Sequence, residues 1–177
     1  PISFKAEYFT SRTRLEELNL CHNQIFHLYL NSFSIHRRLK KLHLCHNRLA
    51  HFSSEILANL RSLNLLDLSY NKLTSLDSSD FANMPSLREL NLAGNEIKFI
   101  GSNVFHNSTQ LYKINLSHNL IHSLDKTTFM GLARLNLDLS YNWLTTLLPD
   151  LFNRQYVAML ESINLSGNQL TRLPSEA

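Results

Sequence analysis

Asparagine returns at an almost constant interval along this chain, and this period constrains the fold more than any other feature of the sequence. The column consists of Asn23, Asn47, Asn71, Asn95, Asn119, Asn142 and Asn168. Subtracting successive residue numbers gives intervals of 24, 24, 24, 24, 23 and 26. A constant period of this size predicts a stack of similar units, in which each unit buries the apolar face of its neighbour.

Each asparagine closes the same frame of apolar residues. The first complete frame is Leu15-x-x-Leu18-x-Leu20-x-x-Asn23-x-Ile25. The alternation over Leu18-x-Leu20 predicts a short strand that buries its leucines. Strands that recur at a constant interval stack in parallel at about 4.8 Å, so we expect one parallel sheet on the concave side. An inward asparagine amide can both donate and accept, and the seven copies should form a structural hydrogen-bonded ladder.

A column of mostly phenylalanine residues lies ten residues after the asparagines. It contains Phe33, Leu57, Phe81, Phe105, Phe129 and, after a small insertion, Phe152. This spacing predicts a core spine beneath the convex side. A 24-residue repeat leaves few residues for that side, so we expect loops and 3₁₀ turns there, with a helical turn within 54–63.

One repeat departs from the period. Arg134 takes the place of its first leucine, and the 23-residue interval indicates a deletion that turns Leu135 into the core. The next repeat has two extra residues around 153–156. We expect a single domain over 1–177, with a partial repeat over 1–14 and repeats that begin near 15, 39, 63, 87, 111, 134 and 160. Because neither end carries a polar cap, we expect a piece of a longer solenoid.

These frames resemble the leucine-rich repeat, in its extracellular "typical" 24-residue class, over nearly the whole chain. Toll-like receptor ectodomains, Slit-type guidance proteins and insect adhesion proteins share this class. The segments 66–71, 114–119 and 137–142 are most similar to chaoptin and its relatives. The resemblance implies an α/β horseshoe solenoid that serves as a protein-binding module of an extracellular, membrane-anchored adhesion or recognition protein, with homophilic binding as one option. The alternatives are a ligand-binding Toll-like signalling ectodomain and a cytosolic regulatory scaffold.

Three acceptor sequons for N-linked glycans support a secretory route. They begin at Asn107, Asn115 and Asn164. We expect Asn107 on a convex loop, and the other two on the concave solvent face. The repeat consensus itself generates Asn-Leu-Ser, so glycan-free side chains at Asn115 and Asn164 remain the alternative.

Exposed positions beside the buried leucines define the expected binding surface. The candidates on and beside the strands are His43, Asp67, Tyr70, Arg88, Tyr112 and Tyr141. Leu120 and Trp143 form an apolar pair in a column that is otherwise polar, which suggests a lateral contact patch. The alternatives are a solvated face without a partner and a Trp143 that folds over the irregular repeat.

Cys21 and Cys45 share a column of small residues. Stacked strands bring them within the Cα range of a disulfide, but a tight column restricts the sulfur torsion, so we favour two free thiols over a bridge. Together with His22 and His46 they lack zinc spacing, so we expect no metal or cofactor.

We expect no enzymatic activity and no nucleic-acid partner. The four glycines form no phosphate loop, and nothing supplies an oxyanion hole beside Ser69. The net charge is only +3, and the one dense basic run, Arg37 to Lys41, is typical of a solvated face. No run of about 18 apolar residues occurs, so an anchor would lie outside this segment.

Overall fold

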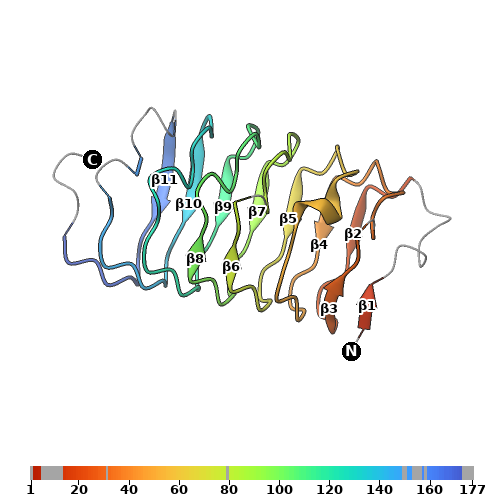
Figure 1. The fold of residues 1–177 in the computed structure, drawn as a ribbon, viewed down its shortest axis with the longest axis horizontal. Helices are drawn as coiled ribbons and strands as arrows, with labels where there is room; N and C mark the ends of the chain where they lie inside the picture. The colour runs from red at the N-terminus through yellow and green to blue at the C-terminus, as the bar shows by residue number, and fades with distance from the viewer. Residues whose placement is uncertain are drawn as a thin grey trace.

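A computed structural model describes residues 2–4, 14–30, 32–78, 80–148, 151–152, 157 and 159–172. Over these residues the chain winds into a parallel solenoid (Figure 1). The seven-stranded sheet has the order β11-β10-β9-β7-β5-β4-β2, so each strand pairs with the strands of the adjacent repeats. The strands are β2 (Glu17–Asn19), β4 (Lys41–His43), β5 (Leu65–Asp67), β7 (Glu89–Asn91), β9 (Lys113–Asn115), β10 (Leu135–Asp138) and β11 (Leu160–Asn164).

The register of this sheet aligns identical repeat positions. Leu18 pairs with Leu42, Leu42 with Leu66, and Leu66 with Leu90. These leucines are buried, and the residues on either side of them face solvent. The expected parallel leucine-rich-repeat sheet is therefore confirmed, in register as well as in direction.

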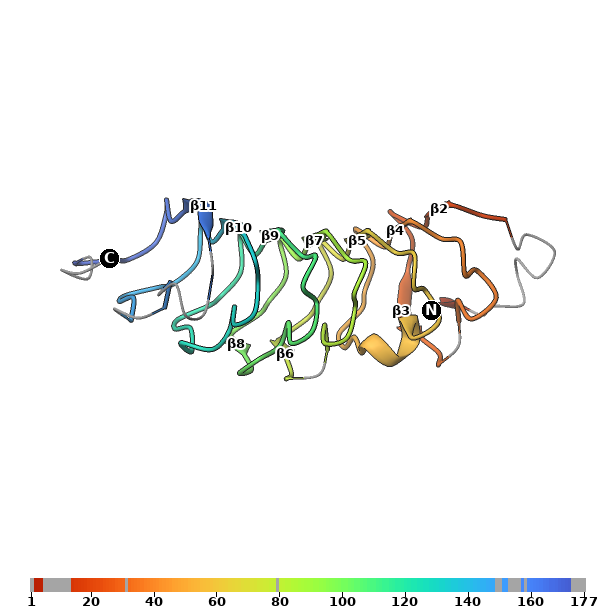
Figure 2. The same cartoon turned by 90° about the horizontal axis from the view of Figure 1, so that it is seen from above.

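The opposite, convex side carries short elements (Figure 2). The 3₁₀ helix η2 (Ser54–Leu57) lies within the expected segment 54–63 but is only four residues long, with the Ser53 side chain accepting from the Glu55 N–H. Two small parallel sheets were not expected from the sequence. They pair β1 (Ile2–Phe4) with β3 (Ile25–Leu28), and β6 (Ser75–Leu76) with β8 (Phe99–Ile100). Since the described repeats run parallel to their neighbours, two extended segments at the same position of adjacent repeats can pair.

The asparagine ladder forms as expected, and Asn71 is representative. Its Nδ2 donates to the carbonyl oxygens of Leu44 in the preceding repeat and Leu68 in its own, at 2.9 and 3.1 Å. Its Oδ1 accepts from the Leu49 N–H at 3.0 Å. One buried amide thus satisfies backbone groups of two repeats and joins them.

The phenylalanine spine is also confirmed. Phe33, Phe81, Phe105 and Phe129 are fully buried. Along the column the ring centroids of Phe81 and Phe105, Phe105 and Phe129, and Phe129 and Phe152 lie 6.1, 6.0 and 6.3 Å apart. Phe52 from the neighbouring column stacks on Phe81 at 5.2 Å, where Leu57 interrupts the phenylalanines.

The irregular repeat is accommodated as the sequence predicts. Leu135 is fully buried, and the register between β10 and β11 shifts between Leu135 and Asn136. Arg134 instead points outward, over the ring of Tyr112 and 3.7 Å from a carboxylate oxygen of Glu161. The extra residues expected around 153–156 lie outside the described part of the chain.

The expectation of free thiols at Cys21 and Cys45 is wrong. The two residues form a disulfide between adjacent repeats, with their Cα atoms 4.5 Å apart. The strand ladder continues past the strands, since the His22 N–H donates to the Cys45 carbonyl at 3.0 Å. This bond holds the two cysteines at pairing distance, and the small side chains of the column leave room for the sulfurs.

Candidate protein-binding site

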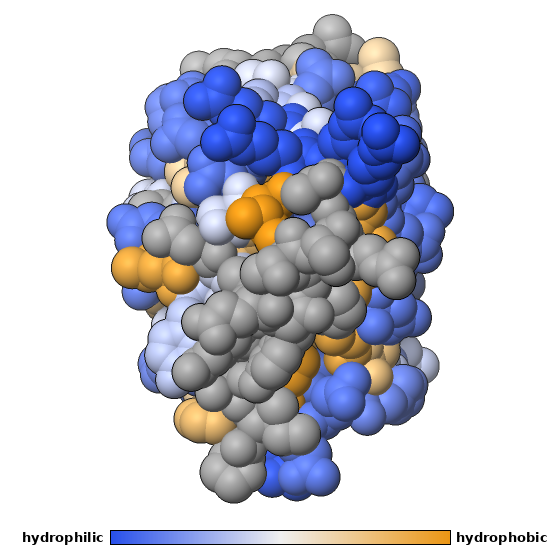
Figure 3. Space-filling model, turned by 90° about the vertical axis from the view of Figure 1, so that its right-hand side faces the viewer, coloured by the Kyte–Doolittle hydropathy of each residue, from blue (hydrophilic) through white to orange (hydrophobic). Residues whose placement is uncertain are grey.

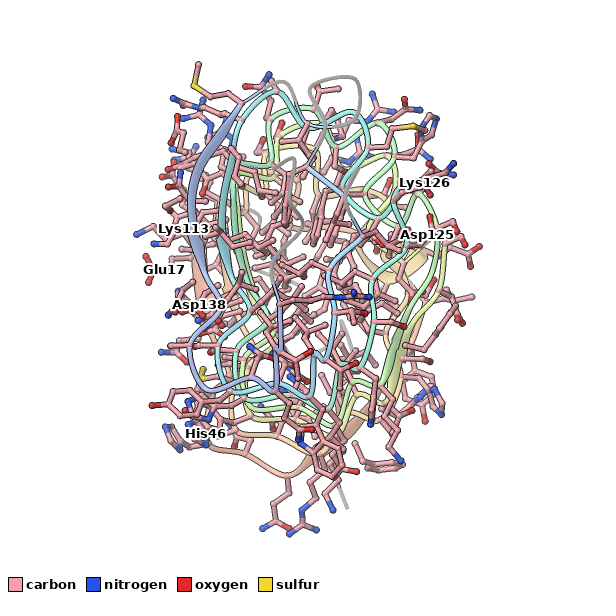
Figure 4. All side chains as sticks on the ribbon, turned by 90° about the vertical axis from the view of Figure 1, so that its left-hand side faces the viewer. Glu17, His46, Lys113, Asp125, Lys126 and Asp138 are labelled. Atoms are coloured by element: carbon pink, nitrogen blue, oxygen red, sulfur yellow. A yellow bond between two sulfur atoms is a disulfide. The ribbon has the colours of Figure 1, made fainter. Side chains whose placement is uncertain are left out.

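The charges of the concave face are largely paired across strands. Glu17, Lys113 and Asp138 mark this face in Figure 4. The ion pairs are Glu16–Lys40 at 2.8 Å, Glu17–Lys41 at 3.3 Å, His43–Glu17 at 3.5 Å and Glu89–Lys113 at 3.1 Å. The hydrogen bond from Lys40 also holds the pKa of the Glu16 carboxyl below its usual value. The face is therefore internally neutralised, which leaves fewer free charges to attract a partner.

Four predicted contact residues lie on this face, and three of them already have partners. His43 contacts Glu17, and Tyr112 lies beneath the Arg134 guanidinium, 4.9 Å from the ring centroid. The Oδ1 of Asp67 accepts from both the N–H and the Oγ of Ser69, at 2.9 and 2.7 Å, so it stabilises the turn after β5.

Arg88 is the fourth concave candidate, and it is exposed. It begins the turn of chain that enters β7, and its backbone carbonyl accepts from both Tyr112 and Lys113. Its guanidinium is thus carried on a backbone that the sheet fixes on both sides. Of the four concave residues, Arg88 is the best placed to contact a partner.

A second surface lies just beyond the ends of the strands. We call it the lateral ridge, and it consists of His22, His46, Tyr70, Gly94, His118, Tyr141 and Gly167. All seven residues have positive φ, between 51° and 69°. His46 marks the ridge at a corner of the molecule, beside the concave face (Figure 4).

Rings on the lateral ridge stack along the solenoid axis. His22 stacks on His46 with centroids 4.3 Å apart, and His46 stacks on Tyr70 at 4.4 Å. His118 stacks on Tyr141 at 4.4 Å. The two tyrosines remain 50% and 56% exposed, so the ridge presents aromatic area on a rigid backbone.

Each tyrosine of the ridge is followed one repeat later by glycine. A Cβ added at Gly94 would meet a ring carbon of Tyr70 at 2.6 Å, and one at Gly167 would meet Tyr141 at 2.7 Å. Glycine suits these two positions for two reasons. The backbone is left-handed there, and the tyrosine ring occupies the space that a side chain would need.

Leu120 and Trp143 lie on the same side, two residues after His118 and Tyr141. Trp143 is 49% exposed, and its ring meets His122 edge-on at 5.3 Å. The tryptophan ring therefore contacts the preceding repeat and keeps about half of its surface exposed. Leu120 is half-buried.

Sequence analysis missed an apolar hollow near the N-terminal end. The hollow has a volume of about 560 Å³ and lies between Tyr29 and Leu30 on one side and Phe52 and Ile56 on the other. Hydrophobic residues are visible at this end in Figure 3. The sequence contains a signal for this hollow, because Tyr29 and Leu30 occupy the positions at which the next repeat has two serines, Ser53 and Ser54.

The three predicted glycan acceptors differ in their surroundings. Asn107 is exposed on the convex side, and its Nδ2 donates to the Oδ1 of Asn83 at 3.0 Å. Asn115 is half-buried, and its Oδ1 accepts from the Ser117 N–H at 2.9 Å. Asn164 is exposed near the C-terminal end. All three lie outside the lateral ridge.

Among the described residues, no helix has the length and apolar character needed to cross a membrane.

The family profile described as "Leucine rich repeat" matches residues 37–97, 89–144 and 109–170, and a second profile with the same description matches 14–35. No curated protein matches the chain.

Two solved structures are similar over nearly the whole chain. One is a crystal structure of a TLR13–ssRNA13 complex, with 24% identity, 97% of this chain and 30% of that chain covered, and a TM-score of 0.81. The other is a Toll–Spatzle complex from Drosophila, with 27% identity, 96% of this chain and 22% of that chain covered, and a TM-score of 0.82. The chain spans less than a third of either. With its stacked repeats, asparagine ladder and matching profile, this chain belongs to the leucine-rich repeat family.

Proposed function

We propose that this chain is a protein-binding module of an extracellular cell-adhesion or recognition protein, and that it binds through the lateral ridge and the adjoining Leu120–Trp143 pair. The observation that carries the proposal is the exposure of Tyr70, Tyr141 and Trp143 on fixed backbone. Tyrosine and tryptophan on rigid, exposed positions are the residues that most often anchor protein partners. Arg88 on the concave face is a secondary contact.

The disulfide supports the extracellular assignment. Structural disulfides persist in oxidising compartments and are rare in the cytosol. Cys21–Cys45 joins two adjacent repeats, as a structural bridge would, which disfavours the cytosolic scaffold. Glycans at Asn107, Asn115 and Asn164 fit the same compartment, and all three acceptors lie outside the lateral ridge.

The ectodomain of a Toll-like signalling receptor is the second candidate, and the two solved relatives favour it. One of them is a complex with a protein, Spatzle, and the other a complex with single-stranded RNA. We propose a protein partner here, since Lys40, Lys41 and Lys113 are paired with glutamates and offer few free charges to phosphates.

Bead aggregation tests the binding surface and the adhesion assignment together. Beads coated with the parent ectodomain should aggregate by homophilic binding, and Tyr141→Ala with Trp143→Ala should reduce aggregation at least fivefold. Arg61→Ala, on the convex side, is the matched control and should leave aggregation unchanged. Aggregation that survives the paired substitution would refute the lateral ridge as the binding surface.

Membrane attachment separates the two candidates. Phosphatidylinositol-specific phospholipase C should release the parent from intact cells if it is a lipid-anchored adhesion protein. Retention on the cells, with a cytoplasmic fragment after protease treatment, would favour the receptor. Intact mass before and after enzymatic removal of N-glycans checks the compartment, since an unchanged mass at all three acceptors contradicts both candidates.

A further inference from the structure

We propose that a row of arginines at the entry to the main sheet binds a sulfated glycosaminoglycan. The row lies at the opposite end of the strands from the lateral ridge, in the short turns that precede the first three strands of the sheet. We call it the arginine edge, and it consists of Arg14, Arg37, Arg38 and Arg61. All four residues are exposed. The inference goes beyond the proposed function, which concerns a protein partner on the other side of the sheet.

The repeats place these turns at equivalent positions. Leu39 and Leu63 each follow a turn, and their N–H groups donate to the carbonyls three residues earlier, at 2.8 and 3.0 Å. One residue later the ladder between repeats begins, since the Lys40 N–H donates to Glu16 at 2.7 Å and the Asn64 N–H donates to Lys40 at 2.8 Å. The backbones of successive turns are therefore about 5 Å apart, and the edge extends over about 10 Å along the solenoid.

The dense basic run from Arg37 to Lys41 divides between two environments. Lys40 and Lys41 are paired with two glutamates of the preceding repeat, at 2.8 and 3.3 Å. Arg37 and Arg38 lie in the turn before them, and none of the four arginines of the edge forms an ion pair with a described residue. The lysine and glutamate charges cancel, whereas the arginine charges do not, so the edge keeps a positive charge.

The surroundings of the arginine edge favour a ligand that is bound by charge. None of the large exposed hydrophobic residues in the described part of the chain lies in these turns. Glu55 borders the same convex hollow as Arg61 without pairing with it. A protein partner would need aromatic or apolar anchors at this place, and single-stranded nucleic acid would need rings on which its bases stack. A polymer that presents anionic groups along its length needs neither.

Arginine specifies the kind of anion. The guanidinium is a planar fork that binds oxyanions through two parallel hydrogen bonds, and it is more weakly hydrated than an ammonium group. Sulfate groups that follow one another along a linear sugar chain could contact the turns of successive repeats. Sulfated glycosaminoglycans are extracellular polymers, so this ligand matches the compartment that the disulfide supports.

Surface plasmon resonance on immobilised heparin tests the edge with the parent ectodomain. Arg37→Ala with Arg38→Ala should weaken binding about tenfold, because two charge-assisted contacts are lost. Arg48→Ala with Lys72→Ala is the matched control, since it removes the same charge from exposed positions beyond the other end of the strands. The control should leave heparin binding unchanged. An equal loss with both paired variants would mean unspecific attraction and would overturn the arginine edge as the site.

A charge-preserving variant tests the role of the guanidinium. Arg37→Lys with Arg38→Lys keeps the charge and removes the planar fork, so it should bind heparin about two- to fivefold more weakly than the wild type. Both residues are exposed, and the thermal unfolding midpoint of each variant should equal that of the wild type. Wild-type affinity in both the alanine and the lysine variants would contradict the proposal.

Competition identifies the class of ligand. Heparin oligosaccharides should displace the ectodomain from the surface, and chemically desulfated heparin should not. Raising the salt concentration from about 0.15 M to about 0.5 M should weaken binding about tenfold or more, as expected for several released counterions. Equal competition by double-stranded DNA or by phosphatidylserine vesicles would overturn the sulfated sugar as the ligand.

The arginine edge and the lateral ridge can be tested separately. Tyr141→Ala with Trp143→Ala should leave heparin binding unchanged, and Arg37→Ala with Arg38→Ala should leave bead aggregation unchanged. Loss of heparin binding in the tyrosine and tryptophan variant would place the sugar on the ridge and refute the edge. A failure of the ridge in the aggregation assay would leave the heparin result intact.

Discussion

The side chain of Asn71 shows how much a single buried residue contributes to this solenoid. Its amide serves Leu44, Leu68 and Leu49 in two repeats, and it also donates to the Ser69 carbonyl. Asn71→Ala leaves the buried Leu49 N–H without its partner, and an unsatisfied buried group costs about 1–3 kcal/mol. The carbonyls of Leu44 and Leu68 keep the donors Asn47 and Asn95, so the loss of the Asn71 donations adds a smaller cost. We expect the free energy of unfolding to fall by about 2–4 kcal/mol in urea titrations.

The same substitution at the exposed end of the column is the control. Asn23 is exposed, and among the described residues its amide donates to the Leu20 and Cys21 carbonyls close by in its own turn. Asn23→Ala should therefore cost less than about 1 kcal/mol, since water can replace its bonds. An equal loss at both positions would contradict the role of burial.

Gly94 allows a prediction that separates backbone strain from side-chain contact. Gly94→Ala places a Cβ 2.6 Å from the Tyr70 ring, at a φ of +66°. Gly131→Ala meets the same kind of backbone, at +87°, with no atom within 4 Å. We expect Gly131→Ala to cost about 1 kcal/mol and Gly94→Ala about 2 kcal/mol in thermal unfolding. In a Tyr70→Ala background, the two costs should become equal.

Sequence analysis was accurate for residues whose role repeats and weaker for residues whose role depends on a neighbour. The ladder asparagines follow from the period, and the buried Leu135 follows from the one-residue break in it. Asp67 was selected as a contact residue, but its carboxylate is held by Ser69. This hydrogen bonding depends on the side chain two residues away, and the strand alternation that places Asp67 on the solvent side does not reveal it.

At the scale of the strand pair, the disulfide joins elements that the sheet has already aligned. Cys21 and Cys45 close a loop with a sequence separation of 24. A loop of this length restricts the unfolded chain by about 3 kcal/mol. We therefore expect Cys21→Ala with Cys45→Ala to lower the free energy of unfolding by about that amount. Reductant should lower the unfolding midpoint of the wild-type chain and leave that of the double variant unchanged.

The ion pair between Glu16 and Lys40, which directly precede β2 and β4, predicts a pH effect at one residue. The Lys40 hydrogen bond lowers the folded-state pKa of Glu16, so the stabilisation is present above the unfolded pKa and is lost as pH falls through the folded value. Lys40→Met should raise the pKa of Glu16 towards its ordinary value, as measured by NMR titration of its carboxyl carbon. Lys113→Met, which removes the Glu89 partner, should leave the Glu16 pKa unchanged.

Elements on the convex side were harder to predict from sequence than the main sheet. The main strands carry a leucine alternation, whereas Ser75–Leu76 and Phe99–Ile100 are too short to show a period. They pair because both follow the ladder asparagine at the same distance. Convex strands of this kind depend on the alignment of repeats, which is a property of the assembled solenoid.

At the scale of the whole molecule, the described repeats contact their neighbours in chain order, and their stabilities should be coupled in the same order. Strands β5, β7 and β9 have paired strands on both sides, whereas β11 lies at the end of the sheet and is largely exposed. We expect hydrogen exchange to be slowest in the first three and fastest in β11.

A defect in the middle of the stack tests this coupling. Asn95→Ala removes amide bonds to both Leu68 and Leu92, and so weakens the junction between two central repeats. If the stability of the solenoid comes from the interfaces between adjacent repeats, a weakened interface allows the repeats on its two sides to unfold separately. Amide exchange should therefore accelerate in β5 and β9 as well as in β7. Exchange that accelerated only within residues 87–110 would mean that each repeat folds on its own. The fixed spacing of the lateral ridge would then have to arise within single repeats and not from their stacking.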